Sequence, residues 1–181
     1  MTLAFAPWSP GAALLGQAAV LLLVAGALKA ADPDRTVGAL RELGWPSSPL
    51  LVRAGAVGEV VLGAAALAIG GPVTAGLVAL SYLGFALFTV AALRSGSPIG
   101  SCGCFGEQDT PPRWLHVLID LGLAAGALAS IAVGDAAVLD SPVALVPSVV
   151  VAAAAYQVMT SGRRAVSAPA GGAAGPGAVA D

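Results

Sequence analysis

The residues with the clearest chemical potential are two cysteines separated by one glycine, Cys102-Gly103-Cys104. Two cysteines form a disulfide only if their Cα atoms come within about 4.4–6.8 Å, so the chain must turn between them. Gly103 removes the steric barrier to such a turn. A bridge this short closes a very small loop and therefore gains little stability by restricting the unfolded chain. A reversible redox pair is thus favoured over a purely stabilising bridge.

Metal binding is a second interpretation of the same cysteines. Two thiolates supply half of a tetrahedral zinc site, and the single histidine, His116, could add a third ligand. No fourth ligand is evident, and one intervening residue is fewer than the roughly two to four that separate most zinc-binding cysteine pairs. Unreactive thiols are the third interpretation. No cofactor is expected; a quinone is a possible one, although no sequence motif supports it.

Long apolar segments surround this motif. Hydrophobic residues make up 57% of the chain and charged residues 10%, whereas a soluble domain carries about 25% charged residues. A helix needs roughly 20 apolar residues to cross a bilayer. Five segments approach that length: 11–31, 50–70, 73–93, 114–134 and 143–160. The sequence therefore predicts an all-α fold, a polytopic membrane helical bundle whose main partner is the lipid bilayer.

One bundle accounts for residues 1–160, and no second domain is expected. The last 21 residues, 161–181, are rich in Ala, Gly and Pro and lack large apolar side chains, which predicts a disordered tail. The first apolar segment has no positively charged residue before it and no convincing cleavage site after it. We therefore interpret it as a retained span rather than a signal peptide.

The positive charges predict how the bundle is oriented. If the first segment starts outside, all eight Lys and Arg residues fall at the inner side: Lys29, Arg35, Arg41, Arg53, Arg94, Arg113, Arg163 and Arg164. The outer connections hold only Gly70-Gly71-Pro72 and the acidic stretch 135–140. Because Lys and Arg are retained in the cytoplasm, the N-terminus is predicted outside, and the C-terminus and cysteine segment inside. No basic cluster indicates a nucleic-acid partner.

The first inner connection carries a short helical pattern. Asp32 is a suitable N-cap and Pro33 a suitable first residue. Val37, Leu40 and Leu43 then recur at spacings of three. This pattern predicts a short helix in the headgroup region. It is either a lid over the bundle or an interfacial connector.

Polar residues occur within the apolar segments, all in the half nearest the cysteines. Glu59 lies about nine residues into its segment, or roughly 13 Å deep at 1.5 Å per residue. A charge at that depth is costly, so we expect either a neutral carboxyl or a cationic partner, with Lys29, Arg53 and Arg113 as candidates. Asp120 is about six residues into its segment.

The spacing of the polar residues in 114–134 suggests a cluster. Arg113, His116 and Asp120 fall at i, i+3 and i+7, which places them on one helical face. They could form a proton-handling or ion-pair cluster. The simpler alternative is that Lys29 and Arg113 extend to the headgroups while the acids are neutral or locally paired. Glycines at 55, 58 and 63, and at 122 and 126, either mark close helix packing or reflect the composition.

The arrangement of these motifs resembles a known family. Residues 26–33, Gly-Ala-Leu-Lys-Ala-Ala-Asp-Pro, close the first segment, and Glu59 and Gly63 lie in the second. The run from Cys102 to Gly106, Cys-Gly-Cys-Phe-Gly, follows the third. This pattern resembles the MauE family of methylamine-utilisation proteins, itself similar to DoxX-like membrane proteins. The resemblance covers about 11–134 and implies four family spans plus a fifth appended.

The resemblance also implies a function. The family is associated with a thioredoxin-like partner and with maturation of the disulfide-rich small subunit of methylamine dehydrogenase. It implies Cys102 and Cys104 as the redox pair, with Lys29 and Glu59 in supporting positions. The leading hypothesis is an integral membrane thiol–disulfide component that assists disulfide formation in an exported protein. The alternatives are a non-enzymatic membrane scaffold or chaperone, and a small-solute carrier using Glu59 and Asp120.

The predicted orientation conflicts with this hypothesis. Disulfide formation belongs on the oxidising, outer side of the membrane, whereas the charges place Cys102 and Cys104 inside. Either the protein moves reducing equivalents from the cytoplasm, or the charge-based orientation is wrong, or the role differs from that of the family.

Overall fold

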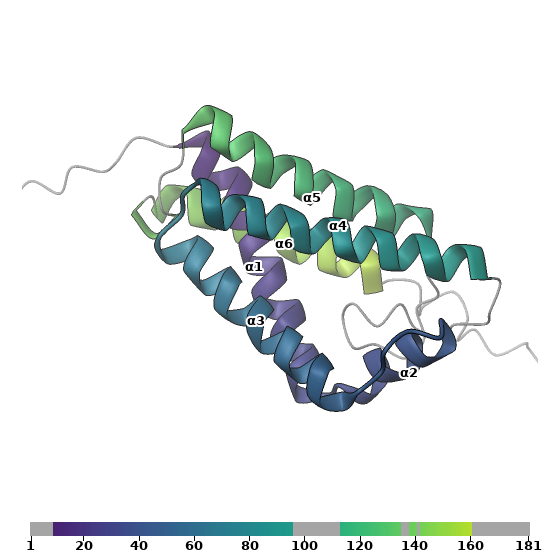
Figure 1. The fold of residues 1–181 in the computed structure, drawn as a ribbon. Coiled ribbons are helices and arrows are strands. Elements are labelled where there is room, and N and C mark those ends of the chain that lie inside the picture. The colour runs from purple at the N-terminus through teal and green to yellow at the C-terminus, as the bar shows by residue number, and fades with distance from the viewer. Residues whose placement is uncertain (1–8, 96–112, 135–137, 141, 161–181) are drawn as a thin grey trace, which may run out of the picture.

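The computed structural model of the protein describes residues 9–95, 113–134, 138–140 and 142–160 (Figure 1). All the regular structure in these parts of the chain is helical, as the sequence predicted. The elements are α1 (Pro10–Ala31), α2 (Asp34–Glu42), α3 (Pro49–Ala68), α4 (Pro72–Ser95), α5 (Trp114–Val133), the 3₁₀ helix η1 (Val138–Asp140) and α6 (Pro142–Thr160). The predicted apolar segments agree with five of these helices to within two residues at each end.

Four of the helices, α1, α3, α4 and α5, are long and apolar enough to cross a membrane. The protein is therefore a multi-pass membrane protein. The predicted fifth segment forms α6, whose apolar stretch Ala144–Gln157 is shorter than the other four. The division into a bundle and a tail stays a prediction, because residues 161–181 lie outside the described part of the chain.

Local sequence signals account for the helix boundaries. Proline is the first residue of α1, α3, α4 and α6, where its missing N–H costs nothing and its fixed φ suits a helix. The Ser9 hydroxyl caps α1 by accepting a hydrogen bond from the Ala12 N–H at 3.3 Å. Gly70 and Gly71 both have positive φ angles, of 65° and 92°, which lets the chain reverse tightly between α3 and α4.

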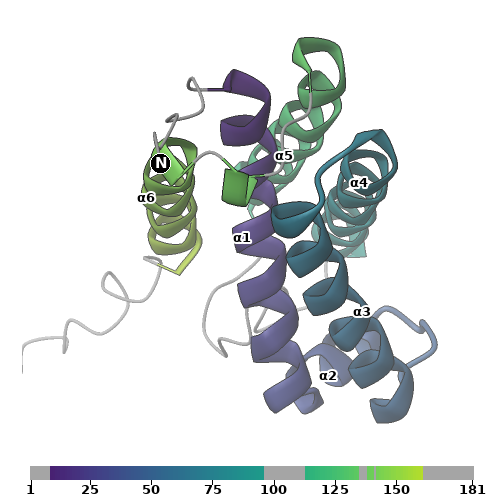
Figure 2. The ribbon, with the colours of Figure 1, turned by 90° about the vertical axis from the view of Figure 1, so that its left-hand side faces the viewer.

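Helix α1 is the centre of the bundle. It contacts α3, α5 and α6, and α4 packs along α5 (Figure 2). Figure 1 shows α3 and α4 diverging from their shared turn, with α2 at the open end between them. This divergence separates the first turns of α3 from the last turns of α4. Those two ends, together with α2, frame the candidate site described below.

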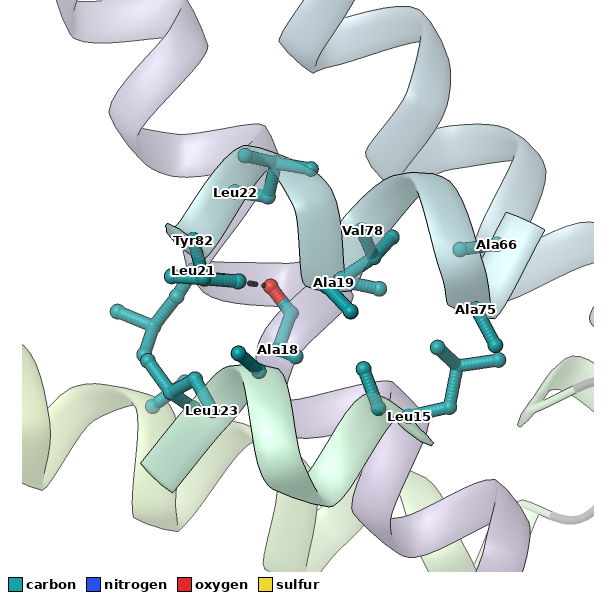
Figure 3. Packing of buried hydrophobic residues seen from close by; sticks show 14 of the residues in the cluster. Leu15, Ala18, Ala19, Leu21, Leu22, Ala66, Ala75, Val78, Tyr82 and Leu123 are labelled. Carbon is teal, nitrogen blue, oxygen red and sulfur yellow. Dashed lines mark hydrogen bonds between the residues drawn. The ribbon is translucent and has the colours of Figure 1, made fainter. Parts of the chain in front are cut away.

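The core around α1 is built from small and branched side chains (Figure 3). Leu15, Leu22, Val78 and Tyr82 are buried there among alanines of α1, α3, α4 and α5. The Tyr82 hydroxyl donates a 2.7 Å hydrogen bond to the carbonyl oxygen of Ala18, which ties α4 to α1. Because lipid provides no hydrophobic drive for helix association, such close contacts and hydrogen bonds hold membrane helices together.

The packing interpretation of the glycines holds for one of the five positions named from the sequence. A Cβ at Gly63 would lie 2.8 Å from the Ala19 carbonyl oxygen, so this glycine permits close approach of α3 to α1. A Cβ at Gly55, Gly58 or Gly122 would meet no atom within 4 Å, and one at Gly126 would make only ordinary contacts.

The short helix predicted in the first inner connection is α2. The structure begins it one residue later than expected, with Pro33 at the N-cap position and Asp34 as the first helical residue. Asp32 instead ends α1, and its Oδ2 lies 3.0 Å from Arg35 Nε. Val37 is buried, and Leu40 and Leu43 pack against a small cluster of Ala39, Phe88 and Ala92. Helix α2 is therefore docked on α4.

Candidate functional site

The central feature of the candidate site is an ion pair between α1 and α3. Lys29 Nζ lies 2.7 Å from Oε1 and 2.6 Å from Oε2 of Glu59. The two side chains are only 7% and 16% exposed. Of the three cationic partners considered from the sequence, the structure pairs Glu59 with Lys29. The interpretation that Lys29 extends to the headgroups is wrong, because this side chain is buried against α3.

Close approach of the two helices makes the pair geometrically feasible. A Cβ at Gly26 would lie 2.7 Å from the Ala56 carbonyl oxygen and 2.9 Å from Glu59 Cβ. The glycine thus lets α1 press against α3 at the level of Glu59. Lys29 follows three residues later, on the same side of α1, and its ammonium reaches the carboxylate.

Aromatic side chains of α4 complete the surroundings of the pair. Lys29 Nζ lies 4.3 Å from the centre of the Phe85 ring, a cation–π distance. Phe85 in turn packs edge-on against Tyr82, with ring centres 5.6 Å apart. The ammonium is therefore held on one side by the carboxylate and on another by an aromatic face.

A cavity of about 290 Å³ adjoins the ion pair. Its walls come from α1, α2, α3, α4 and the α2–α3 connection, and they are mostly apolar. The lining residues are Lys29, Thr36, Leu40, Trp45, Pro46, Leu51, Val52, Gly55, Ala56, Glu59, Phe85 and Phe88. Helix α2 supplies Thr36 and Leu40 to the wall and so covers part of the cavity, while its two interpretations, lid and interfacial connector, both stay predictions.

The predicted polar cluster on α5 is partly correct. His116 and Asp120 are both buried, at 5% and 4% exposure. His116 Nδ1 accepts a 3.1 Å hydrogen bond from the Arg113 N–H. Arg113 does not share their buried face. It is the N-cap of α5, its backbone is extended, and its side chain is exposed.

The cysteine motif lies outside the described residues, but the helices on either side are described. Helix α4 ends at Ser95 and α5 begins at Trp114. Both ends lie at the α2 end of the bundle, where α1 ends and α3 begins (Figure 1). Within the described residues no three His, Cys, Asp or Glu side chains gather into a metal site. Since both cysteines are outside this part of the chain, the zinc interpretation stays a prediction.

Comparison with known proteins identifies the family to which the chain belongs. The family model described as methylamine utilisation protein MauE matches residues 7–133. The chain belongs to the MauE family. The matched range includes α1 to α5 and both cysteines and leaves α6 outside, as the sequence resemblance indicated. Neither a curated protein nor a solved structure matched the chain.

Sequence reasoning missed the aromatic part of the site in this MauE-family protein. Trp45, Phe85 and Phe88 line the cavity, and Tyr82 supports Phe85. A signal was present, because Tyr82, Phe85 and Phe88 recur every three residues in a chain with only 5% aromatic residues. That spacing gathers them on one side of a helix, although it does not identify the helix that they face.

Proposed function

We propose that this MauE-family protein is an integral membrane thiol–disulfide component that assists disulfide formation in an exported protein, such as a methylamine dehydrogenase subunit. Cys102 and Cys104 form its redox pair and exchange electrons with a thioredoxin-like partner. The observation that carries the proposal is the family match. The matched range includes both cysteines, and the family model is described as methylamine utilisation protein MauE. The spacing of the two cysteines around Gly103 supports it.

The exchange follows ordinary thiol–disulfide chemistry. One thiolate of a reduced partner attacks one sulfur of the Cys102–Cys104 disulfide, and the other sulfur leaves as a thiolate and takes a proton. The second partner thiolate then attacks the mixed disulfide and releases the partner in its oxidised form. Two electrons have moved to Cys102 and Cys104, which become a dithiol. The same two steps run in reverse with an oxidised thioredoxin-like partner, which accepts the two electrons and restores the disulfide.

Lys29 and Glu59 act as positioning residues in this proposal. Their ion pair joins α1 to α3 next to the cavity, while α4 and α5 carry the two ends of the cysteine segment. The described cations support an inner location for that segment: Lys29, Arg35, Arg41, Arg53, Arg94 and Arg113 all fall at this end of the bundle. In that orientation the protein would carry reducing equivalents from the cytoplasm.

Trapping of a mixed disulfide tests the proposal. Cys102→Ala and Cys104→Ala each leave one thiol, and one of the two variants should retain a thioredoxin-like protein through a bond that reductant cleaves. The double variant is the control. In the unaltered protein, acid quenching followed by mass spectrometry should show the loss of two hydrogen atoms, confined to the peptide with both cysteines. A pair that stays reduced under oxidant, with no trapped partner, would leave the scaffold or chaperone interpretation in its place.

A small-solute carrier is the second candidate, and the cavity beside Glu59 is the observation that favours it. The variant Glu59→Gln distinguishes the carrier function from the thiol–disulfide function. If Glu59→Gln abolishes function in cells while Cys102 and Cys104 still exchange disulfides at the original rate, the carrier interpretation is supported and the thiol role is not.

A further inference from the structure

The cavity beside Lys29 and Glu59 has the composition of a small-molecule site. Most of its wall is apolar or aromatic, and one ion pair supplies the concentrated polar group. Ligand pockets in proteins combine these two elements, with apolar walls for affinity and a few placed polar groups for orientation. The volume of about 290 Å³ is near the lower limit for such pockets. It suits a single ring rather than a whole lipid or a peptide.

The ion pair indicates that the ligand is neutral. The Lys29 ammonium is already matched by the carboxylate of Glu59 and the face of Phe85. A charged ligand would leave one buried charge uncompensated, which is expensive within a membrane. An ammonium has three N–H donors, so Lys29 can donate to a ligand carbonyl oxygen while it holds Glu59, and a Glu59 oxygen can accept from a ligand hydroxyl. The ligand is therefore expected to carry oxygen atoms that exchange hydrogen bonds with this pair.

The aromatic walls favour a flat ring. Trp45 and Phe88 meet edge to face with ring centres 5.8 Å apart, and Phe85 is a further lining ring whose centre lies 4.3 Å from Lys29 Nζ. Aromatic side chains bind planar rings through offset or edge-on contacts that aliphatic chains do not make. Trp45 and Phe88 come from different segments, so this wall forms only when the α2–α3 connection is packed against α4.

Part of the cavity lining is exposed and apolar. Two lining residues, Leu51 and Trp45, are 61% and 39% exposed, and the neighbouring Leu50 is 76% exposed. Exposed leucines at the start of a membrane-spanning helix face lipid, and tryptophan is typical of the membrane interface. A ligand dissolved in the bilayer could thus reach the ion pair without passing through water.

From these four properties we infer that the cavity binds the ring of a lipid-soluble quinone. The functional part of this inference rests on the proposed thiol–disulfide role, and it adds a two-electron acceptor in the bilayer to the oxidised thioredoxin-like partner that can also restore the disulfide. The two thiols of Cys102 and Cys104 would give up two electrons and two protons. The quinone takes up both and becomes a hydroquinone. Binding of the ring itself does not depend on the cysteines.

Fluorescence of Trp45 tests the binding. The chain has three tryptophans, so Trp8→Phe and Trp114→Phe leave Trp45 as the only emitter. Both cysteines are changed to serine to exclude thiol chemistry. The purified full chain in nanodiscs is titrated with dimethoxy-methyl-benzoquinone, a ring without a long tail. Quenching should saturate. Tetramethoxytoluene keeps the ring and its substituents but replaces both carbonyls by ethers, and it should compete at least about tenfold more weakly.

Two glycines on α3 provide matched variants. Gly55 lines the cavity and Gly58 does not, and a Cβ at either position would meet no atom within 4 Å. Gly55→Leu should fill part of the cavity and weaken the quinone affinity by about tenfold or more, whereas Gly58→Leu should leave it within about twofold. Both substitutions replace glycine by leucine in one helix, so their effects on helix propensity are similar.

The outcomes separate this inference from the proposed function. Quenching that rises linearly without saturation, equal effects of the two leucine variants, or equal binding of tetramethoxytoluene would each overturn the quinone site. Loss of the quinone site together with intact trapping of a thioredoxin-like partner would refute only this inference. Saturable, Gly55-dependent binding in a protein whose cysteines never form a disulfide would support the site and refute the thiol role.

Discussion

The ammonium of Lys29 lies 2.6 Å from Oε2 of Glu59, although the two residues are 30 positions apart and on different helices. Either charge alone would be costly at this depth in a bilayer, by several kcal/mol. Together they offset each other, and the Phe85 ring adds a favourable contact to the ammonium. The pair is thus a specific structural link between α1 and α3 and the polar end of a cavity.

Removing one partner of this pair should cost more than removing both. Lys29→Met leaves the Glu59 carboxylate uncompensated, and Glu59→Leu does the same to the ammonium. Each single variant should lose about 3–5 kcal/mol of unfolding free energy, because an unpaired buried charge remains. The double variant should lose much less than the sum. Unfolding in detergent mixtures, followed by tryptophan fluorescence, measures all three. Strictly additive losses would mean that the two groups do not interact.

Tyr82→Phe should loosen the contact between α4 and α1. The substitution removes only the hydroxyl that donates to the Ala18 carbonyl oxygen at 2.7 Å. The expected loss is about 1 kcal/mol, the usual size of such a hydrogen bond. Ser81→Ala is the matched control, since the Ser81 hydroxyl donates to the Leu77 carbonyl oxygen within its own helix. Equal effects of the two variants in the same unfolding assay would argue against an interhelical role for the hydroxyl.

Gly63→Ala should force α3 away from α1. The added Cβ would approach the Ala19 carbonyl oxygen to 2.8 Å, and a backbone atom cannot rotate away as a side chain can. We expect a loss of about 1–3 kcal/mol, as for other overpacked contacts. Gly58→Ala is the control, because its Cβ would meet nothing within 4 Å and alanine favours the helix. A Gly63 variant as stable as the Gly58 variant would show that the helices separate freely.

Hydrophobic run length was enough to locate the membrane helices. The apolar segments, bounded by Pro10, Pro49, Pro72 and Pro142, match the helices because proline ends an apolar run and begins a helix. The depth of Glu59 in its apolar segment was also enough to predict that its carboxyl is either neutral or paired with a cation. Which cation meets it could not be read from the chain, because that depends on the rotation of α1 and α3 about their axes. Lys29 is buried against α3, whereas Arg53 and Arg113 are exposed.

The cavity itself was beyond sequence reasoning for a related reason. Its aromatic wall joins Trp45, which precedes α3, to Phe88 near the end of α4. These residues meet because α3 and α4 diverge from a turn formed by Gly70 and Gly71, and because α2 then docks on α4. Periodicity within one segment shows which face is apolar, but the angle between segments is set by packing.

The orientation of the protein can be tested with the two cysteines of the proposed redox pair. Six described cations lie at the α2 end of the bundle, which predicts that the cysteine segment is cytoplasmic. In intact cells, Cys102 in a Cys104→Ser background should be shielded from an impermeant maleimide and become labelled after permeabilisation. Leu139→Cys in a chain without other cysteines is the matched reporter. Leu139 is 57% exposed in η1, at the opposite end of the bundle, and should be labelled in intact cells. The reverse pattern would place Cys102 and Cys104 on the oxidising side of the membrane. In that case the pair could oxidise exported proteins directly, and transport of reducing equivalents from the cytoplasm would no longer be required.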